Sequence, residues 1–247
     1  MIPQREIIAW RATAPWPSDV QVEQDLLITR CVAAIFNDEF LRDNLAMRGG
    51  TALHKVHLAP ATRYSEDIDL VLLTRWRDSV VKQHLTQVLQ PIMNSRPSTP
   101  LNDVIVGVRN MVSSSRIIRQ AYAFTPTQQG APRAKLKVEV NCSEHEPVYK
   151  VVTIPFDTGF GVVDLKTYDI DEMLGTKMRA LFQRDQSRDL FDLNRALTDL
   201  RLSIVPTRTG SYSLSANTCR TKGPRSMRMR FAAICHTNWR CHPSGTI

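Results

Sequence analysis

Acidic side chains stand at alternate positions in an apolar run, and this pattern constrains the fold more than any other feature of the chain. Residues 67–73 read Asp-Ile-Asp-Leu-Val-Leu-Leu. Side chains of a β-strand alternate between its two faces, so Asp67 and Asp69 would share one face while Ile68 and Leu70 point to the other. The run therefore predicts a strand with the core on one side and two carboxylates on the other.

A glycine pair precedes this strand. Gly49, Gly50 and Thr51 lead into residues 51–58, which read as a short helix with its first N–H groups open to a ligand. A glycine turn of this kind can admit phosphate, and carboxylate oxygens are preferred ligands of Mg²⁺. The two features together predict a magnesium-dependent nucleotide site. The plainer alternatives are a tight turn at the glycines and surface carboxylates at a strand end.

The other periodic segments predict an α+β chain. Spacings of three and four between apolar residues indicate helices, whereas alternation and β-branched residues indicate strands. The expected helices cover residues 19–35, 38–46, 78–92, 171–182 and 187–200. The expected strands, besides the acidic one, cover residues 104–111, 116–124, 135–141 and 148–155. In the strand at 135–141 apolar and polar residues alternate, which places Glu139 on a polar face.

The net charge of +8 would suggest a nucleic-acid partner if it were spread over the chain. It is concentrated in residues 201–247, which contain eight Lys or Arg and no Asp or Glu, whereas residues 1–200 hold equal numbers of basic and acidic groups. The last 47 residues also lack a sustained helical or strand period. We therefore expect this tail to be disordered or to be the product of an altered reading frame.

No stretch of the sequence is long and apolar enough to cross a bilayer, and the first residues lack the charged and apolar regions of a signal peptide. We therefore expect a cytoplasmic protein without a membrane partner.

Four motifs follow one another along the chain. The first is Arg48-Gly-Gly-Thr-Ala-Leu with Arg63-x-Ser65-x-Asp67-Ile-Asp69-Leu; the second is Lys135-Leu-Lys-Val-Glu139-Val. The third is Asp171-Glu-Met-Leu-x-x-Lys177-x-Arg179-Ala-Leu, and the fourth is Arg188-Asp-Leu-Phe-Asp192-Leu. In this order, over about residues 20–200, they resemble the AbiEii/AbiGii family of nucleotidyltransferases, the toxins of bacterial abortive-infection and type IV toxin–antitoxin pairs. Thr51 stands where the wider superfamily has serine and keeps the hydroxyl.

The resemblance implies a role for each motif. The implied metal ligands, for Mg²⁺ or Mn²⁺, are Asp67, Asp69 and Glu139. The implied phosphate-binding residues are Gly49, Gly50, Thr51, Arg63, Ser65 and Lys177. The implied catalytic residues are Asp67, Asp69, Glu139, Lys177 and Asp189, with Glu139 polarising the attacking hydroxyl and Lys177 neutralising charge on the transferred phosphates.

Ordinary structural roles compete with several of these assignments. Glu139 could be an exposed strand residue paired with Lys135 or Lys137, and Lys177 could be a solvated helix lysine. Asp189 could form a salt bridge with a nearby arginine, which is as consistent with the sequence as a role as base or as orienter of Lys177. His54 and His57, on the helix after the glycines, are expected to be packing or capping residues.

The predicted architecture is a nucleotidyltransferase-like mixed sheet flanked by helices. We expect a core over 1–165, a helical region over 166–200 that carries Lys177 and Asp189, and the basic tail over 201–247. The resemblance implies a toxin that transfers a nucleoside monophosphate from a nucleoside triphosphate to an RNA, with the tRNA 3′ end as the favoured acceptor, and thereby blocks translation. It also implies a cognate antitoxin.

Two other functions fit the same residues. One is transfer to a small molecule, as in aminoglycoside-modifying nucleotidyltransferases. The other is a catalytically silent binding module, because the family expects more helix after the fourth motif and this chain continues into the acid-free tail instead.

Overall fold

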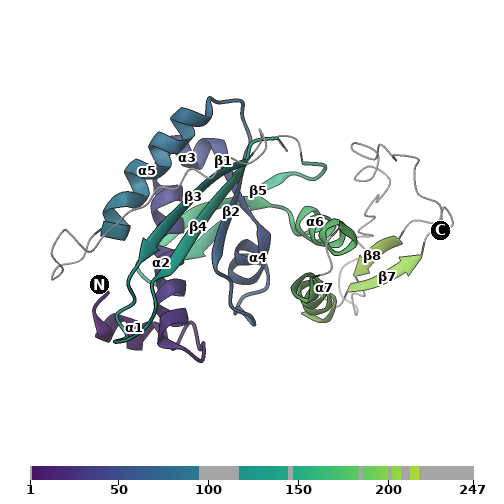
Figure 1. Cartoon of the computed structure of the whole chain (residues 1–247). Coiled ribbons are helices and arrows are strands. Elements are labelled where there is room, and N and C mark those ends of the chain that lie inside the picture. Colours follow the sequence, from purple (N-terminus) through teal and green to yellow (C-terminus); the bar gives the residue numbers. More distant parts are fainter. Residues whose placement is uncertain are drawn as a thin grey trace, which may run out of the picture. The chain divides into compact units, whose positions relative to one another are not determined.

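A six-stranded mixed sheet forms the centre of the first part of the chain (Figure 1). The strands are β1 Leu45–Arg48, β2 Asp67–Leu72, β3 Ile117–Phe124, β4 Ala134–Asn141, β5 Val151–Asp157 and β6 Val162–Tyr168. Their order across the sheet is β3-β4-β2-β1-β6-β5, with β2 parallel to β4, β1 parallel to β6, and the remaining neighbours antiparallel. The predicted mixed sheet is therefore confirmed.

The structure is a computed structural model, and it describes residues 2–94, 117–143, 147–183 and 186–199, together with the backbone of 202–206 and 212–216. The chain divides into two units, Met1–Asp169 and Ile170–Ile247. The finer division predicted above, into 1–165, 166–200 and 201–247, stays a prediction.

Helices flank the sheet in the first unit. They are α1 Gln4–Trp10, α2 Asp19–Asn37, α3 Glu39–Asn44, α4 Gly49–Ala52, the π-helix η1 Leu53–His57, and α5 Asp78–Asn94. α2 and α5 pack against each other and cover the sheet (Figure 1). Ser18 caps the start of α2: its Oγ accepts a hydrogen bond from Val20 N at 3.3 Å, and its backbone N donates to Gln21 Oε1. This capping box satisfies N–H groups that the first turn leaves open.

The second unit begins with the helices α6 Ile170–Gln183 and α7 Ser187–Asp199. β7 Leu202–Pro206 and β8 Tyr212–Ala216 follow and pair as antiparallel strands. The sequence did not predict either strand. The rest of the predicted irregular tail lies outside the described residues, as does the predicted strand at 104–111. None of the described helices is long and apolar enough to cross a membrane.

Several elements differ from the sequence prediction. The helix expected over 38–46 ends at Asn44, because Leu45 turns to an extended conformation and pairs with Leu72 of β2. The helix after the glycines begins at Gly49 itself and continues as a π-helix from Leu53. β6 was not predicted; its buried residues alternate with charged ones, a pattern that short strands share with loops.

Consecutive polar residues of α2 are buried and connect this helix to the strands and to η1. Glu23 accepts a hydrogen bond from Thr127 N at 2.7 Å. Gln24 Nε2 donates to the carbonyls of Glu66 (3.3 Å) and Lys135 (3.2 Å), which lie at the starts of β2 and β4. Because a buried polar group is costly unless it is hydrogen-bonded, these contacts fix the spacing of the two strands that carry the predicted carboxylates.

The next residue, Asp25, extends the same connection to η1. Its carboxylate accepts hydrogen bonds from Trp10 Nε1 (2.8 Å), Trp16 Nε1 (3.1 Å) and Lys55 Nζ (2.7 Å). Burial lowers the pKa of Lys55, and the charge and hydrogen bond of Asp25 oppose that shift. The pair anchors the helix that follows the glycines to α2.

Candidate active site

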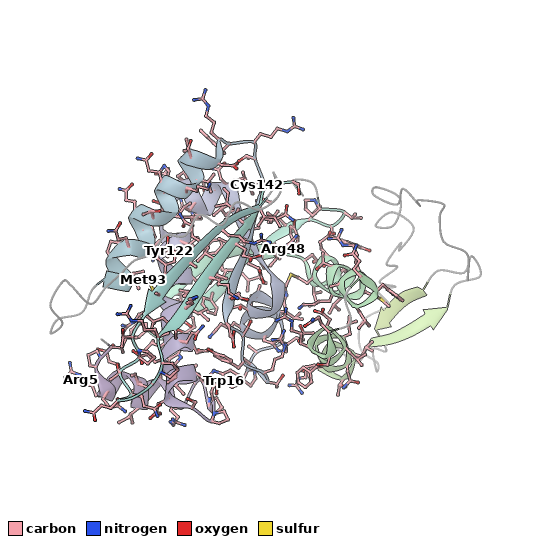
Figure 2. The ribbon with its side chains drawn as sticks, viewed as in Figure 1. Arg5, Trp16, Arg48, Met93, Tyr122 and Cys142 are labelled. Atoms are coloured by element: carbon pink, nitrogen blue, oxygen red, sulfur yellow. The ribbon has the colours of Figure 1, made fainter. Side chains whose placement is uncertain are left out.

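The carboxylates of β2 and β4 lie on one face of the sheet and in register. Asp69 pairs with Glu139 on one side and with Arg48 on the other, and Glu139 in turn pairs with Arg119. Residues directly opposite one another on adjacent strands point to the same face. Across β3, β4, β2 and β1 they form a row in which two neighbouring carboxylates, Glu139 and Asp69, stand between two arginines, Arg119 and Arg48. Arg48 is labelled in Figure 2. The opposite face holds buried apolar residues such as Ile68 and Val138.

Glu139 and Asp67 each form an ion pair with a basic side chain of an adjacent strand. Arg119 Nε donates to Glu139 Oε1 at 3.0 Å, and each side chain is 33% exposed. The partner of Glu139 is therefore Arg119. Lys135 and Lys137, the partners expected if Glu139 were an ordinary strand residue, do not take this place. Lys137 Nζ instead lies 3.6 Å from Asp67 Oδ1, beyond hydrogen-bond distance.

Asp67 Oδ1 is a buried oxygen that accepts no hydrogen bond. An unsatisfied buried acceptor is unfavourable, and a divalent cation is a ligand that would satisfy it. Asp67 and Asp69, two carboxylates on one face of a strand, therefore fit the implied metal. Among the described residues, however, no group of three His, Cys, Asp or Glu side chains is arranged to hold a metal ion. Glu139, engaged by Arg119, does not complete such a group in this structure.

The glycine turn packs directly against the acidic strand. Gly49 has φ 79°, and a Cβ built on it would lie 2.0 Å from Asp69 Oδ2. A Cβ on Gly50 would lie 2.5 Å from Arg63 Nη2. The absence of a side chain at both positions is what lets the Asp69 carboxylate and the Arg63 guanidinium reach the turn.

Thr51 and Ser65 connect this turn to β2. Thr51 is fully buried; its Oγ1 donates to the carbonyl of Asp67 at 2.5 Å and lies 2.7 Å from Ser65 Oγ. The Thr51 hydroxyl thus binds the strand in this structure, whereas the sequence suggested that it would bind phosphate. The structure brings together the seven residues predicted from the first motif: Gly49, Gly50, Thr51, Arg63, Ser65, Asp67 and Asp69.

Replacement of Gly49 by Ala is expected to destabilise the fold by about 2–3 kcal/mol, because it adds left-handed backbone strain to a clash with Asp69. Gly130 is the matched control, since its φ of 76° imposes the same strain while a Cβ there would meet nothing within 4 Å. Gly130→Ala should cost only about 1–2 kcal/mol. Urea unfolding of the two variants measures the difference, and equal losses would contradict a specific contact between Gly49 and Asp69.

Both histidines of η1, His54 and His57, are packed into the protein. His54 is fully buried. Burial lowers the pKa of His57 below its ordinary value of 6.5, against the smaller raising effects of a hydrogen bond with the Tyr168 backbone and of the Asp169 charge. Both observations agree with the packing role expected for these residues.

The lowered pKa of His57 makes the stability of the protein pH-dependent. Below pH 6.5 the unfolded chain binds a proton at this position that the folded chain resists, so the free energy of unfolding should fall with decreasing pH, by at most about 1.4 kcal/mol per pH unit. His57→Gln should flatten this part of the profile. Melting temperatures measured between pH 8 and pH 5 test it, and identical profiles for the variant and the parent would contradict it.

In the second unit, Lys177 of α6 is held by two aspartates of α7. Lys177 Nζ lies 3.2 Å from Asp189 Oδ1 and 2.8 Å from Asp192 Oδ2. Lys177 is 7% exposed and both aspartates are fully buried, so the alternative of a solvated helix lysine is wrong. Asp189 accepts a hydrogen bond from Lys177, and Arg195 pairs with Asp199. Asp192 was absent from the predicted site, although its i,i+3 spacing from Asp189 was the signal for it.

The sequence of the chain matches the family described as nucleotidyl transferase AbiEii toxin, type IV TA system, over residues 30–222. The chain belongs to this family. It is therefore a nucleotidyltransferase, and the resemblance read from the four motifs is confirmed. Membership of a type IV toxin–antitoxin family implies a nucleoside triphosphate as substrate and an antitoxin as partner. No curated protein matches the chain.

Solved structures support the fold of this AbiEii-family chain. MenT4, a nucleotidyltransferase toxin from Mycobacterium tuberculosis H37Rv, is similar with a TM-score of 0.56 and 20% identity over 80% of this chain and 65% of that one. A protein from H. pylori described as a nucleotidyltransferase has a TM-score of 0.51 and 18% identity over 74% of this chain and 70% of that one. The family member described here therefore spans about two thirds of the length of these proteins.

Proposed function

We propose that this protein transfers a nucleoside monophosphate from a nucleoside triphosphate to an RNA acceptor in a reaction that requires Mg²⁺, with the 3′ end of tRNA as the acceptor. The observation that carries the proposal is the buried, unsatisfied oxygen of Asp67 on the same strand face as Asp69, directly against the Gly49 turn. Carboxylate oxygens beside a backbone that phosphate can approach are what a metal-bound triphosphate requires.

Metal binding, phosphate binding and proton transfer would fall to different residues of the site. Asp67 and Asp69 would hold the cation, with Glu139 as a third ligand. A bound cation supplies positive charge at the phosphates and makes the acceptor hydroxyl more acidic. Gly49 and Gly50 would let the triphosphate approach the backbone, and Arg63 would add charge beside it. Glu139, whose side chain is 33% exposed, would accept the proton of the attacking hydroxyl.

The bond changes are those of a displacement at phosphorus. The oxygen of the acceptor hydroxyl forms a bond to the α-phosphorus, the bond from that phosphorus to the bridging oxygen breaks, and pyrophosphate leaves. Within the second unit, Asp189 and Asp192 hold the ammonium of Lys177. Its action on the phosphates, with Asp189 as the orienting carboxylate, stays a prediction of the family resemblance.

The RNA acceptor is favoured by the exposed cations on the carboxylate face. Arg119 and Lys137 lie on β3 and β4 beside the acidic residues, and Lys135 is an exposed neighbour on β4. Phosphodiester groups are bound by exposed Lys and Arg of this kind. A tRNA acceptor would also place the reaction in the cytoplasm, where its effect would be to block translation.

Incubation of the full chain with Mg²⁺, each of the four labelled nucleoside triphosphates and total tRNA tests donor, metal and acceptor together. Label should enter tRNA from at least one triphosphate, and chelation of the metal should prevent it. A parallel panel of aminoglycosides tests the small-molecule alternative. Label that enters the aminoglycosides but not tRNA would establish that alternative. No transfer to any acceptor by a folded protein that still binds nucleotide would instead favour a silent binding module.

A further inference from the structure

We propose that Arg119 exchanges partners during the reaction: it neutralises Glu139 before the metal binds, and afterwards it binds phosphate oxygens of the donor or of the RNA. This inference rests on the proposed function and adds a residue that none of the four motifs contains. The chemistry of the second partner is a phosphate oxygen, and the experiment below separates the two sources.

The register of the sheet places Arg119 where both partners are within reach. It lies opposite Glu139, which lies opposite Asp69, so the guanidinium stands at the end of the row of carboxylates and on the same face. Its Nε is the atom that bonds Glu139 Oε1. A guanidinium has four further N–H donors on its terminal nitrogens, which suit a forked contact with phosphate.

The exposure of the Arg119–Glu139 pair makes the exchange energetically easy. Both side chains are 33% exposed, and ion pairs of this kind contribute about 0–1 kcal/mol. A divalent cation held by Asp67 and Asp69 would therefore compete successfully for Glu139. The pair between Lys177 and Asp192 is the contrast within this chain, because it is buried and would be costly to break.

Arg119 is a better candidate for this role than Lys137. Lys137 Nζ forms an ion pair with Asp67 Oδ1 at 3.6 Å without a hydrogen bond, so Asp67 is engaged less closely than Glu139. Glu139, in contrast to Asp67, has an oxygen, Oε1, that already accepts a hydrogen bond. Completion of a three-carboxylate site through Glu139 Oε1 therefore depends on the release of Arg119.

Binding of Mn²⁺ to the nucleotide-free protein, measured by electron paramagnetic resonance, tests the first half of the exchange. Arg119→Gln removes the competing cation and should tighten Mn²⁺ binding about two- to fivefold. Arg119→Lys keeps the charge and should stay close to the parent. Arg30→Gln is the matched control, because Arg30 forms a similarly exposed pair with Glu6 (28% and 31% exposed) between α1 and α2. It should leave Mn²⁺ affinity unchanged.

Binding of phosphate-bearing ligands in the presence of Mg²⁺ tests the second half. The two probes are a non-hydrolysable nucleoside triphosphate and a short RNA with a tRNA-like 3′ end. Arg119→Gln should weaken one of them about tenfold, because it removes a charge-assisted hydrogen bond. Weaker triphosphate binding identifies the donor as the source of the phosphate, and weaker RNA binding identifies the acceptor. Unchanged binding of both probes overturns the proposal.

The outcomes separate this inference from the proposed function. In one outcome, the parent protein binds Mn²⁺ and transfers nucleotide while the Arg119→Gln variant matches it in both binding experiments. That result overturns the partner exchange and leaves the proposed function standing. A parent that binds no Mn²⁺ overturns the exchange together with the metal dependence. Tighter Mn²⁺ binding combined with weaker phosphate binding is the result that a merely structural ion pair would not produce.

Discussion

Asp69→Asn is expected to lower the rate of nucleotidyl transfer by about 10³-fold or more while the protein stays folded. Asparagine has the shape of aspartate, so its side chain can occupy the same space beside Gly49. The Asp69 side chain lies so close to Gly49 that even a Cβ at position 49 would clash with it. It lacks the negative charge, however, and a neutral amide is a poor substitute for a carboxylate at a divalent cation. Initial rates with labelled triphosphate, together with the melting temperature of the variant, measure the two parts of this expectation.

Asp164 provides the matched control for this substitution. It lies on β6 of the same sheet, exposed and between the buried residues Val163 and Leu165, so it is also an aspartate on the polar side of a strand. Asp164→Asn should leave transfer unchanged. Loss of transfer in both variants would show a general effect of charge on the sheet, and retention of transfer by Asp69→Asn would refute the metal role of this carboxylate.

The alternating pattern of the acidic strand was enough to predict its faces, because local sequence decides which side chains a strand buries. Ile68 and Leu70 are buried and the aspartates are not, as the pattern required. The same reasoning placed Glu139 on a polar face of β4. What this reasoning lacked was the pairing partner of each strand. The contact between Arg119 and Glu139 depends on the register between β3 and β4, and the row with Asp69 depends on a parallel pairing of segments about 70 residues apart.

Buried polar residues were the other feature that the sequence did not reveal. Glu23, Gln24 and Asp25 interrupt an amphipathic helix, and their composition alone is typical of a solvated face. Each is buried because its partner comes from a distant element, as with Gln24 and the carbonyl of Lys135. Such partners become apparent only in three dimensions. The site therefore consists of motif residues that sequence analysis can find and of supporting contacts that it cannot.

Lys177 illustrates the same limit, and its removal should have the largest effect on stability. Lys177→Met is expected to lower the free energy of unfolding by about 3–5 kcal/mol, because it leaves the charges of Asp189 and Asp192 buried without the ammonium between them. Lys82→Met, at a half-buried lysine of α5, is the matched control and should change stability little. Chemical denaturation of the full chain, followed by circular dichroism, measures both variants.

The pH dependence of the Lys177→Met variant distinguishes the loss of the ammonium charge from the loss of packing. Without the ammonium, burial should raise the pKa of at least one aspartate in the folded variant above its unfolded value, so that the folded state binds the extra proton. Its stability should then increase as the pH is lowered from 7 toward about 4, where the unfolded carboxyl also becomes protonated. The variant that also carries Asp189→Asn and Asp192→Asn should recover part of the stability at pH 7, since neither buried charge remains. A loss that is the same at pH 7 and pH 5, and that the added substitutions do not reduce, would mean that Lys177 stabilises α6 and α7 by packing alone.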